Sequence, residues 1–166
     1  MKAHPRSKIS IRLVALRIRE ILQIGINEKI DVIRLLEFVL CPIFDITLII
    51  VEKKDMIDKY AEYNPIEKTI KIREDVYDRA ANGIGRDRFT ISHEIGHIFL
   101  HSNNIAMARS NENFPIYYDP EWQANIFASE FLCPIEGISK NSCIDIISNK
   151  YGVSKEVARI QLSEKK

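Results

Sequence analysis

The pattern His-Glu-x-x-His at residues 93–97 constrains this chain more than any other feature of its sequence. On a helix, residues four apart lie on one face, so His93 and His97 can bind the same metal ion. Zinc sites of hydrolases use three protein ligands and a water, whose pKa the metal lowers toward about 7. Glu94, beside such a water, could accept its proton. Two unrelated histidines on an ordinary helix would give the same pattern. A zinc site also needs a third ligand, which must come from elsewhere in the chain.

Apolar periodicity around the motif predicts an α+β fold that is mostly helical, with a small β-sheet. The β-branched run Thr47–Val51 predicts a strand with both faces at least partly covered. The segment Thr69-Ile70-Lys71-Ile72 alternates, so Ile70 and Ile72 should face the core and Lys71 the solvent. Residues 52–64, between these strands, are polar and indicate a turn or short helix.

Helical spacing and capping residues predict the remaining elements. A helix begins near Ile9 and ends at Gly25, and a second, capped by Asn27, is stopped by Cys41-Pro42. Gly96 inside the motif helix costs about 1 kcal/mol relative to Ala, which suggests that another backbone approaches closely. We expect further helices at 75–81, at 120–133, from a cap at Ser142 to Tyr151, and after a cap at Ser154.

The helix predicted to start at residue 120 carries the best candidate for the third ligand. Asp119 can cap it, Pro120 suits its first turn, and Glu121 follows. A carboxylate near a helix N-terminus stays ionised, as a metal requires, so Glu121 fits a site of two histidines and one carboxylate. Asn125 shares this face, whereas Glu130 lies about half a turn away and competes poorly. Glu121 also has a simpler interpretation, as a first-turn residue that complements the helix dipole.

Composition adds a prediction about the beginning of the chain. At 166 residues the chain fits one domain with a sizeable core, and a formal net charge of +1 gives no general argument for nucleic-acid or membrane binding. Residues 1–24, however, hold six Lys and Arg residues against Glu20 alone. They could contact nucleic acid or an acidic partner, but the solvated face of a terminal helix is the simpler interpretation.

The sequence favours a cytoplasmic location. Charged residues from Arg12 onward interrupt the apolar run that a signal peptide would need. The most apolar stretch, residues 38–51, is broken by a proline and an aspartate and is shorter than the ~20 residues of a membrane span. The cysteines are odd in number and form no Cys-x-x-Cys pair, so we expect free thiols in a reducing compartment at Cys41, Cys133 and Cys143.

Two segments together resemble the ImmA/IrrE family of metallo-endopeptidases: Gly85 to His101, which contains the motif, and Glu121 to Pro134. The similarity extends loosely over residues 25–166, whereas the first two dozen residues match only in being a helix. The resemblance implies a zincin-like fold in which His93, His97 and Glu121 bind Zn²⁺ and Glu94 is the catalytic base. Cys133 stands where the family usually has Met, and both are soft apolar side chains.

The resemblance also implies a partner, because characterised relatives cleave a helix-turn-helix repressor encoded nearby, on a mobile element or in a stress regulon, and so relieve repression. We therefore expect a single zincin-like metallopeptidase domain over residues 1–166. It would comprise a basic N-terminal helix (1–24), a catalytic core (25–134) and a C-terminal helical pair (135–166). The substrate would lie extended along an exposed strand edge, for which Thr69 to Ile72 is the candidate.

Peptide hydrolysis would also need a donor for the charge that develops on the carbonyl oxygen. His101, Tyr117 and Tyr118 are candidates, and Asn125 is a candidate substrate contact. His101 can equally be an ordinary residue at a helix end. The two tyrosines belong to residues 102–118, which are rich in Asn and Ser and indicate a long loop of the kind that often carries function.

Two other functions stay open. The chain could bind a repressor or antitoxin without cleaving it and use zinc only to hold its fold, although a structural site has no use for a base such as Glu94. The last two helices, 142–163, could instead form a DNA-binding helix-turn-helix, but they carry little positive charge, which argues against direct nucleic-acid binding.

Overall fold

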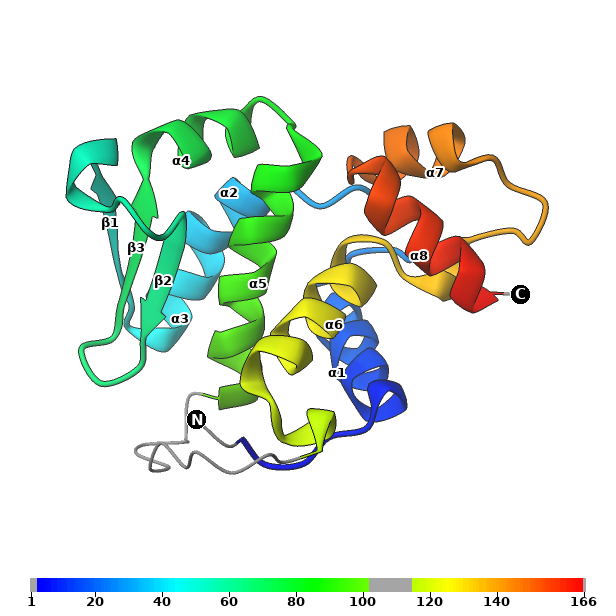
Figure 1. Cartoon of the computed structure of the whole chain (residues 1–166), viewed down its shortest axis with the longest axis horizontal. Coiled ribbons are helices and arrows are strands. Elements are labelled where there is room, and N and C mark those ends of the chain that lie inside the picture. The colour runs from blue at the N-terminus through cyan, green and yellow to red at the C-terminus, as the bar shows by residue number, and fades with distance from the viewer. Residues whose placement is uncertain (1–2, 102–114, 166) are drawn as a thin grey trace.

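The computed structural model describes residues 3–101 and 115–165. Figure 1 shows the motif helix, α5, running through the middle of the molecule between the sheet and α6. In the described ranges no helix has the length and hydropathy needed to cross a membrane. The loop predicted at 102–118 lies mostly outside the described residues.

In chain order the elements are α1 (Lys8–Ile21), α2 (Val32–Leu35), η1 (Leu36–Leu40), α3 (Cys41–Phe44), β1 (Thr47–Val51), η2 (Lys53–Asp55), β2 (Ala61–Asn64), β3 (Thr69–Arg73), α4 (Glu74–Ala81), α5 (Gly85–His101), η3 (Ile116–Tyr118), α6 (Pro120–Leu132), η4 (Ile135–Gly137), α7 (Ile144–Tyr151) and α8 (Lys155–Lys165).

The sheet has three strands in the order β1-β3-β2, so β3 is its central strand. It pairs with β1 in parallel and with β2 antiparallel. Ile70 and Ile72 are completely buried and Lys71 is exposed, which confirms the predicted alternation. β1 is an edge strand, and Leu48, Ile49 and Val51, which lie on its two faces, are partly buried, so both faces are partly covered as predicted, although Ile50 is exposed.

β2 is a strand where the sequence indicated a turn or short helix. It forms a hairpin with β3, and in the connecting turn Asn64 Oδ1 accepts hydrogen bonds from the main-chain N–H groups of Ile66 and Glu67. The hairpin context overrides the weak strand propensity of Ala61–Asn64. The predicted substrate edge, Thr69 to Ile72, was therefore wrong: β3 is paired on both sides, and its main chain has no free edge.

The second helix begins and ends later than predicted. Asp31 rather than Asn27 is its N-cap, and its Oδ1 accepts from the Arg34 N–H at 3.0 Å. The helix continues past Pro42 because η1 is a π-helical turn, in which the Cys41 N–H bonds to the Leu36 carbonyl. This wider turn gives room to a proline, which has no N–H and would crowd the carbonyl four residues earlier.

α5 and α6 approach each other closely at Gly96. A Cβ at this position would lie 3.1 Å from Phe127 Cδ1 and 3.2 Å from Ala124 Cα, so glycine permits the approach that the sequence suggested. Phe127 is completely buried, whereas Glu121 lies on the exposed face of α6. The crossing brings Glu121 opposite the histidines of α5.

Two basic residues of α1 face inward, so the solvated-face interpretation was wrong for them. Arg12 Nε donates to Glu130, which is completely buried on α6, across 3.0 Å. Arg19 is 1% exposed and donates to the main-chain carbonyls of Phe131, Gly25 and Glu28. The contacts with Glu130 and Phe131 hold α1 against α6.

Of the residues predicted to bound the C-terminal helices, Gly152 and Ser154 are confirmed, whereas Ser142 was wrong because Cys143 is the N-cap of α7. Gly152, with φ of 61°, ends α7, and Ser154 Oγ accepts from the Val157 N–H at 3.2 Å before α8. Arg88 of α5 is buried and donates to the Ile30 and Tyr151 carbonyls, which links the motif helix to both neighbouring parts of the chain. All three cysteines are free, as expected.

Candidate metal centre

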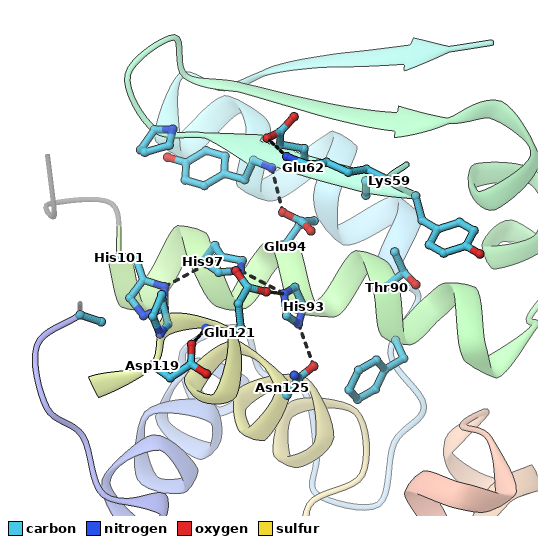
Figure 2. Close-up of a pocket in the computed structure, with 17 residues that line it drawn as sticks. Lys59, Glu62, Thr90, His93, Glu94, His97, His101, Asp119, Glu121 and Asn125 are labelled. Atoms are coloured by element: carbon cyan, nitrogen blue, oxygen red, sulfur yellow. Dashed lines mark hydrogen bonds and ion pairs between the residues drawn. The ribbon is translucent and has the colours of Figure 1, made fainter. Parts of the chain in front are cut away.

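Three side chains from α5 and α6 converge at one point (Figure 2). His93 Nε2 lies 3.0 Å from His97 Nε2 and 3.1 Å from Glu121 Oε2. His97 Nε2 lies 3.5 Å from Glu121 Oε1. Ligands of a tetrahedral zinc ion lie about 3.3 Å from one another, because each is about 2.0 Å from the metal. The spacing of the three groups therefore fits zinc.

The contacts of the Nδ1 atoms determine the tautomer of each histidine. His93 Nδ1 lies 2.9 Å from Asn125 Oδ1, an acceptor, so this nitrogen carries the ring proton. His97 Nδ1 lies 3.0 Å from His101 Nδ1, so one of these two nitrogens carries the proton between them, and we take it to be that of His97. A neutral imidazole with its proton on Nδ1 has its lone pair on Nε2. In that form the two Nε2 atoms and the Glu121 carboxylate face one another as acceptors, and a cation between them, either a proton or a metal ion, relieves their repulsion, so the donor set fits a metal ion.

The negative charge at the cluster attracts a cation, whether a proton or a metal ion. The contacts with His93 and then His97 hold the pKa of Glu121 well below its usual range, so the side chain is a carboxylate. Burial acts to lower the pKa of His93, but the hydrogen bond to Glu121 and the charge of Glu94 outweigh it and raise the pKa. Asp119 caps α6 by accepting from the Glu121 N–H at 3.0 Å. The N-terminus of α6 adds a positive partial charge beside the carboxylate.

Glu94 lies next to the ligands, between α5 and β2 (Figure 2). Its Oε2 accepts from the main-chain N–H of Tyr63 at 2.8 Å, and the residue is 8% exposed. Burial raises the pKa of Glu94, and the neighbouring His97 and His93 partly oppose this shift. A raised pKa lies closer to neutral pH, which suits a group that first accepts and later donates a proton.

A cavity of about 920 Å³ opens over these residues. Residues 59–63 and Pro65 form one wall, α5 forms the floor, and Asp119 to Glu121 form part of the opposite wall. The three candidate ligands and Glu94 all line it. The cavity is large enough to receive a segment of peptide beside the candidate base.

The other predicted contacts are placed differently. Both ring nitrogens of buried His101 are engaged, with His97 and Gln123, so it is not available as a donor to a substrate. Burial lowers the pKa of His101 to about 4. Tyr117 and Tyr118 lie in η3, and neither is among the described residues that line the cavity. Asn125 does line it, with its side-chain oxygen directed to His93.

Sequence reasoning missed the roles of Tyr63 and Gln123. Tyr63 acts through its main-chain N–H, which no side-chain pattern reveals. Gln123 is completely buried behind His101, but a buried glutamine looks like an exposed one in sequence. Glu130 lies away from the cluster and pairs with Arg12, in agreement with its predicted orientation.

Comparison with known families agrees with this arrangement. The family model Peptidase_M78, described as the IrrE N-terminal-like domain, matches residues 51–163. This range includes the motif helix, β2 and α6. No curated protein matches the chain.

Proposed function

This chain belongs to the Peptidase_M78 family of IrrE N-terminal-like domains, and we propose that it is a zinc-dependent endopeptidase that cleaves a helix-turn-helix transcriptional repressor and so relieves repression. One observation carries the proposal: three metal-ligand side chains and a buried carboxylate meet at the floor of one cavity. A structural metal site would use the three ligands but has no need of the Glu94 carboxylate.

The chemistry divides between the metal and Glu94. Zinc held by His93, His97 and Glu121 would polarise the scissile carbonyl and lower the pKa of the attacking water toward ~7. Glu94 would accept a proton from the attacking water as the water oxygen bonds to the carbonyl carbon. It would then donate the proton to the leaving amine as the carbon–nitrogen bond breaks. The Tyr63 N–H donates to one carboxylate oxygen of Glu94, which leaves the other oxygen to accept the proton of the water.

β2 replaces β3 as the strand expected to bind the substrate, because β2 is an edge strand and lines the cavity. The Tyr60 carbonyl accepts from the Arg73 N–H at 3.0 Å. The alternation of an antiparallel ladder then directs the main-chain groups of Ala61 and Tyr63 away from β3. The Tyr63 N–H, which reaches Glu94, has this outward direction. An extended substrate can therefore pair with Ala61 beside the base.

A substrate antiparallel to β2 would have a fixed direction. Its N-terminal part would lie toward Pro65 and its C-terminal part toward Tyr60. Figure 2 shows Lys59 and Thr90 at this second end of the cavity and His101 at the first. Tyr60 and Phe89 also line the cavity, and the Arg86 guanidinium lies 5.4 Å from the Tyr60 ring centre. We expect a preference for apolar or aromatic residues after the scissile bond.

A repressor could supply such an extended segment from a linker or an exposed terminal arm. This substrate would place the enzyme in the cytoplasm, and three free cysteines suit a reducing compartment.

The rival function is binding of a repressor or antitoxin without cleavage, with zinc holding the fold. Burial of Glu94 against the ligands argues for the peptidase, because placing a carboxylate there carries a desolvation penalty that binding alone does not require.

Mixing the purified, zinc-loaded protein with helix-turn-helix repressors, beginning with any encoded near its own gene, tests the proposal. We expect two fragments, whose junction mass spectrometry locates in an extended segment. Glu94→Gln should retain zinc by metal analysis and cleave at least ~100-fold more slowly. Cleavage that survives in Glu94→Gln contradicts the mechanism. A stable complex without fragments from the wild-type protein supports sequestration instead.

A further inference from the structure

His97 is connected to the main chain by a line of buried hydrogen bonds. His97 Nδ1 lies 3.0 Å from His101 Nδ1, and His101 Nε2 lies 3.0 Å from Gln123 Oε1. Gln123 Nε2 donates to the carbonyl oxygens of His4 and Tyr117, both at 2.8 Å. Gln123 is 0% exposed and His101 is 9% exposed. In Figure 2, His101 lies on the side of His97 away from His93.

The two carbonyls at the end of this line decide the direction of every bond in it. Carbonyl oxygens only accept, so the amide nitrogen of Gln123 must face them and its oxygen must face His101. His101 Nε2 therefore carries a proton, which leaves His101 Nδ1 as an acceptor. His97 must then donate from Nδ1, so its lone pair lies on Nε2, toward His93 and Glu121. The other neutral tautomer of His97 would place two lone pairs against each other.

We propose that Gln123 and His101 are positioning residues that hold His97 in the tautomer that binds zinc through Nε2. This inference rests on the zinc site of the proposed function. Neither residue contacts the reacting atoms, and both act through the ligand, as partners of metal-bound histidines commonly do. A water could not replace Gln123 without opening the core, because the amide is completely buried.

The line also makes the beginning of the chain part of the metal site. The Ala3 N–H donates to the Tyr118 carbonyl at 2.7 Å, and the Arg6 N–H donates to the Tyr117 carbonyl at 3.0 Å. These bonds hold the segment 3–6 beside η3 and so keep the His4 carbonyl on Gln123. The segment therefore supports His97 from a distance of about ninety residues along the chain.

Zinc affinity, measured by competition with a chromophoric chelator, separates positioning from general stabilisation. Gln123→Met keeps the length of the side chain but removes the amide, and we expect about 10–100-fold weaker zinc binding. His101→Phe keeps a ring without nitrogens and should show a similar loss. The Co²⁺-loaded variants should also differ from the wild-type protein in their visible absorption spectrum, because the orientation of His97 changes.

Gln161→Met is the matched control. Gln161 is 1% exposed and donates to the Cys133 carbonyl at 2.7 Å, but it lies on α8, which provides no ligand. This variant should lower the thermal midpoint of the metal-free protein while leaving zinc affinity and the Co²⁺ spectrum unchanged.

The outcomes distinguish the inference from the proposed function. A wild-type protein that binds no zinc overturns both. If the wild-type protein binds zinc and His101→Phe binds it equally tightly with the same Co²⁺ spectrum, the positioning role is wrong and the peptidase proposal stands. His101→Phe gives this answer even where Gln123→Met does not fold.

Discussion

The main-chain N–H of Tyr63 donates to Glu94 Oε2 across 2.8 Å, so β2, an edge strand of the sheet, meets the candidate base at one atom pair. The carboxylate is buried, and this bond limits its rotation. A substrate that pairs with β2 would consequently present its backbone beside the group that handles the proton. Strand pairing and proton transfer are thus coupled by the position of a single peptide N–H.

Ala61→Pro tests the pairing of substrate with β2. The Ala61 N–H is directed away from β3, so proline removes a group that faces the cavity without removing a ladder hydrogen bond. We expect zinc affinity and thermal midpoint close to wild type. Peptide hydrolysis, measured as kcat/KM, should fall about tenfold, which is the contribution of one hydrogen bond.

Glu62→Pro is the control for this prediction. Its N–H is directed toward β3, so proline there should disrupt the hairpin and lower the thermal midpoint. If Ala61→Pro hydrolyses peptides at the wild-type rate while Glu62→Pro unfolds, the substrate does not use the Ala61 N–H.

Much of the metal site could be predicted from the sequence because its signals are local. The spacing of His93 and His97 follows from the pitch of a helix, and Asp119-Pro120 marks the start of the helix that carries Glu121. Gly96 indicated the close helix crossing that brings the two together. In each case a few neighbouring residues contain the information.

The features that could not be predicted depend on contacts between distant segments. β2 is a strand because β3 pairs with it, and the order β1-β3-β2 follows from a crossover that no periodicity encodes. Arg19 has the sequence context of a surface residue and lies in the core because distant carbonyls accept its protons. Gln123 likewise acquires its role only where His4 and His101 meet it.

Gly96→Ala should separate stability from metal binding. The added methyl gains about 1 kcal/mol of helix propensity, but it would lie 3.2 Å from Ala124 Cα, a backbone atom that can move only with α6. A small shift of α6 displaces Glu121. We expect the thermal midpoint of the metal-free protein to change by a few degrees at most. Zinc affinity should weaken about tenfold, by chelator competition. Unchanged affinity would show that α6 adjusts without moving its ligand.

Thiol labelling tests the packing of the core. Cys41 and Cys133 are buried, and Cys143 is exposed. Burial raises the pKa of Cys133 to about 12, so almost none of it is thiolate at pH 8. A chromogenic disulfide reagent should label one thiol per native chain, and all three in denaturant. Cys143→Ser should abolish the native reaction. Rapid labelling of Cys133 in the native protein would contradict the packing described for α6.

Arg12→Met tests the buried ion pair between α1 and α6. Glu130 is completely buried and the Arg12 side chain is 19% exposed, so removing the guanidinium leaves a buried carboxylate without its cation. We expect the metal-free protein to lose about 3 kcal/mol of unfolding free energy at pH 7, measured by urea denaturation. Arg12→Met combined with Glu130→Leu should recover most of this loss, because two apolar side chains have no charge to desolvate.

The pH dependence of the unfolding free energy of Arg12→Met shows whether the loss of stability arises from charge. Burial raises the pKa of Glu130, and Arg12 opposes this shift, so the pKa should rise further in the variant. A carboxyl group whose folded pKa exceeds its unfolded pKa stabilises the fold below the unfolded value, and this stabilisation is lost as pH rises through the folded pKa. The variant should therefore be closer to wild type in stability at pH 4 than at pH 7. An equal deficit at both pH values would mean that Arg12 acts through packing of its aliphatic stem rather than through its charge.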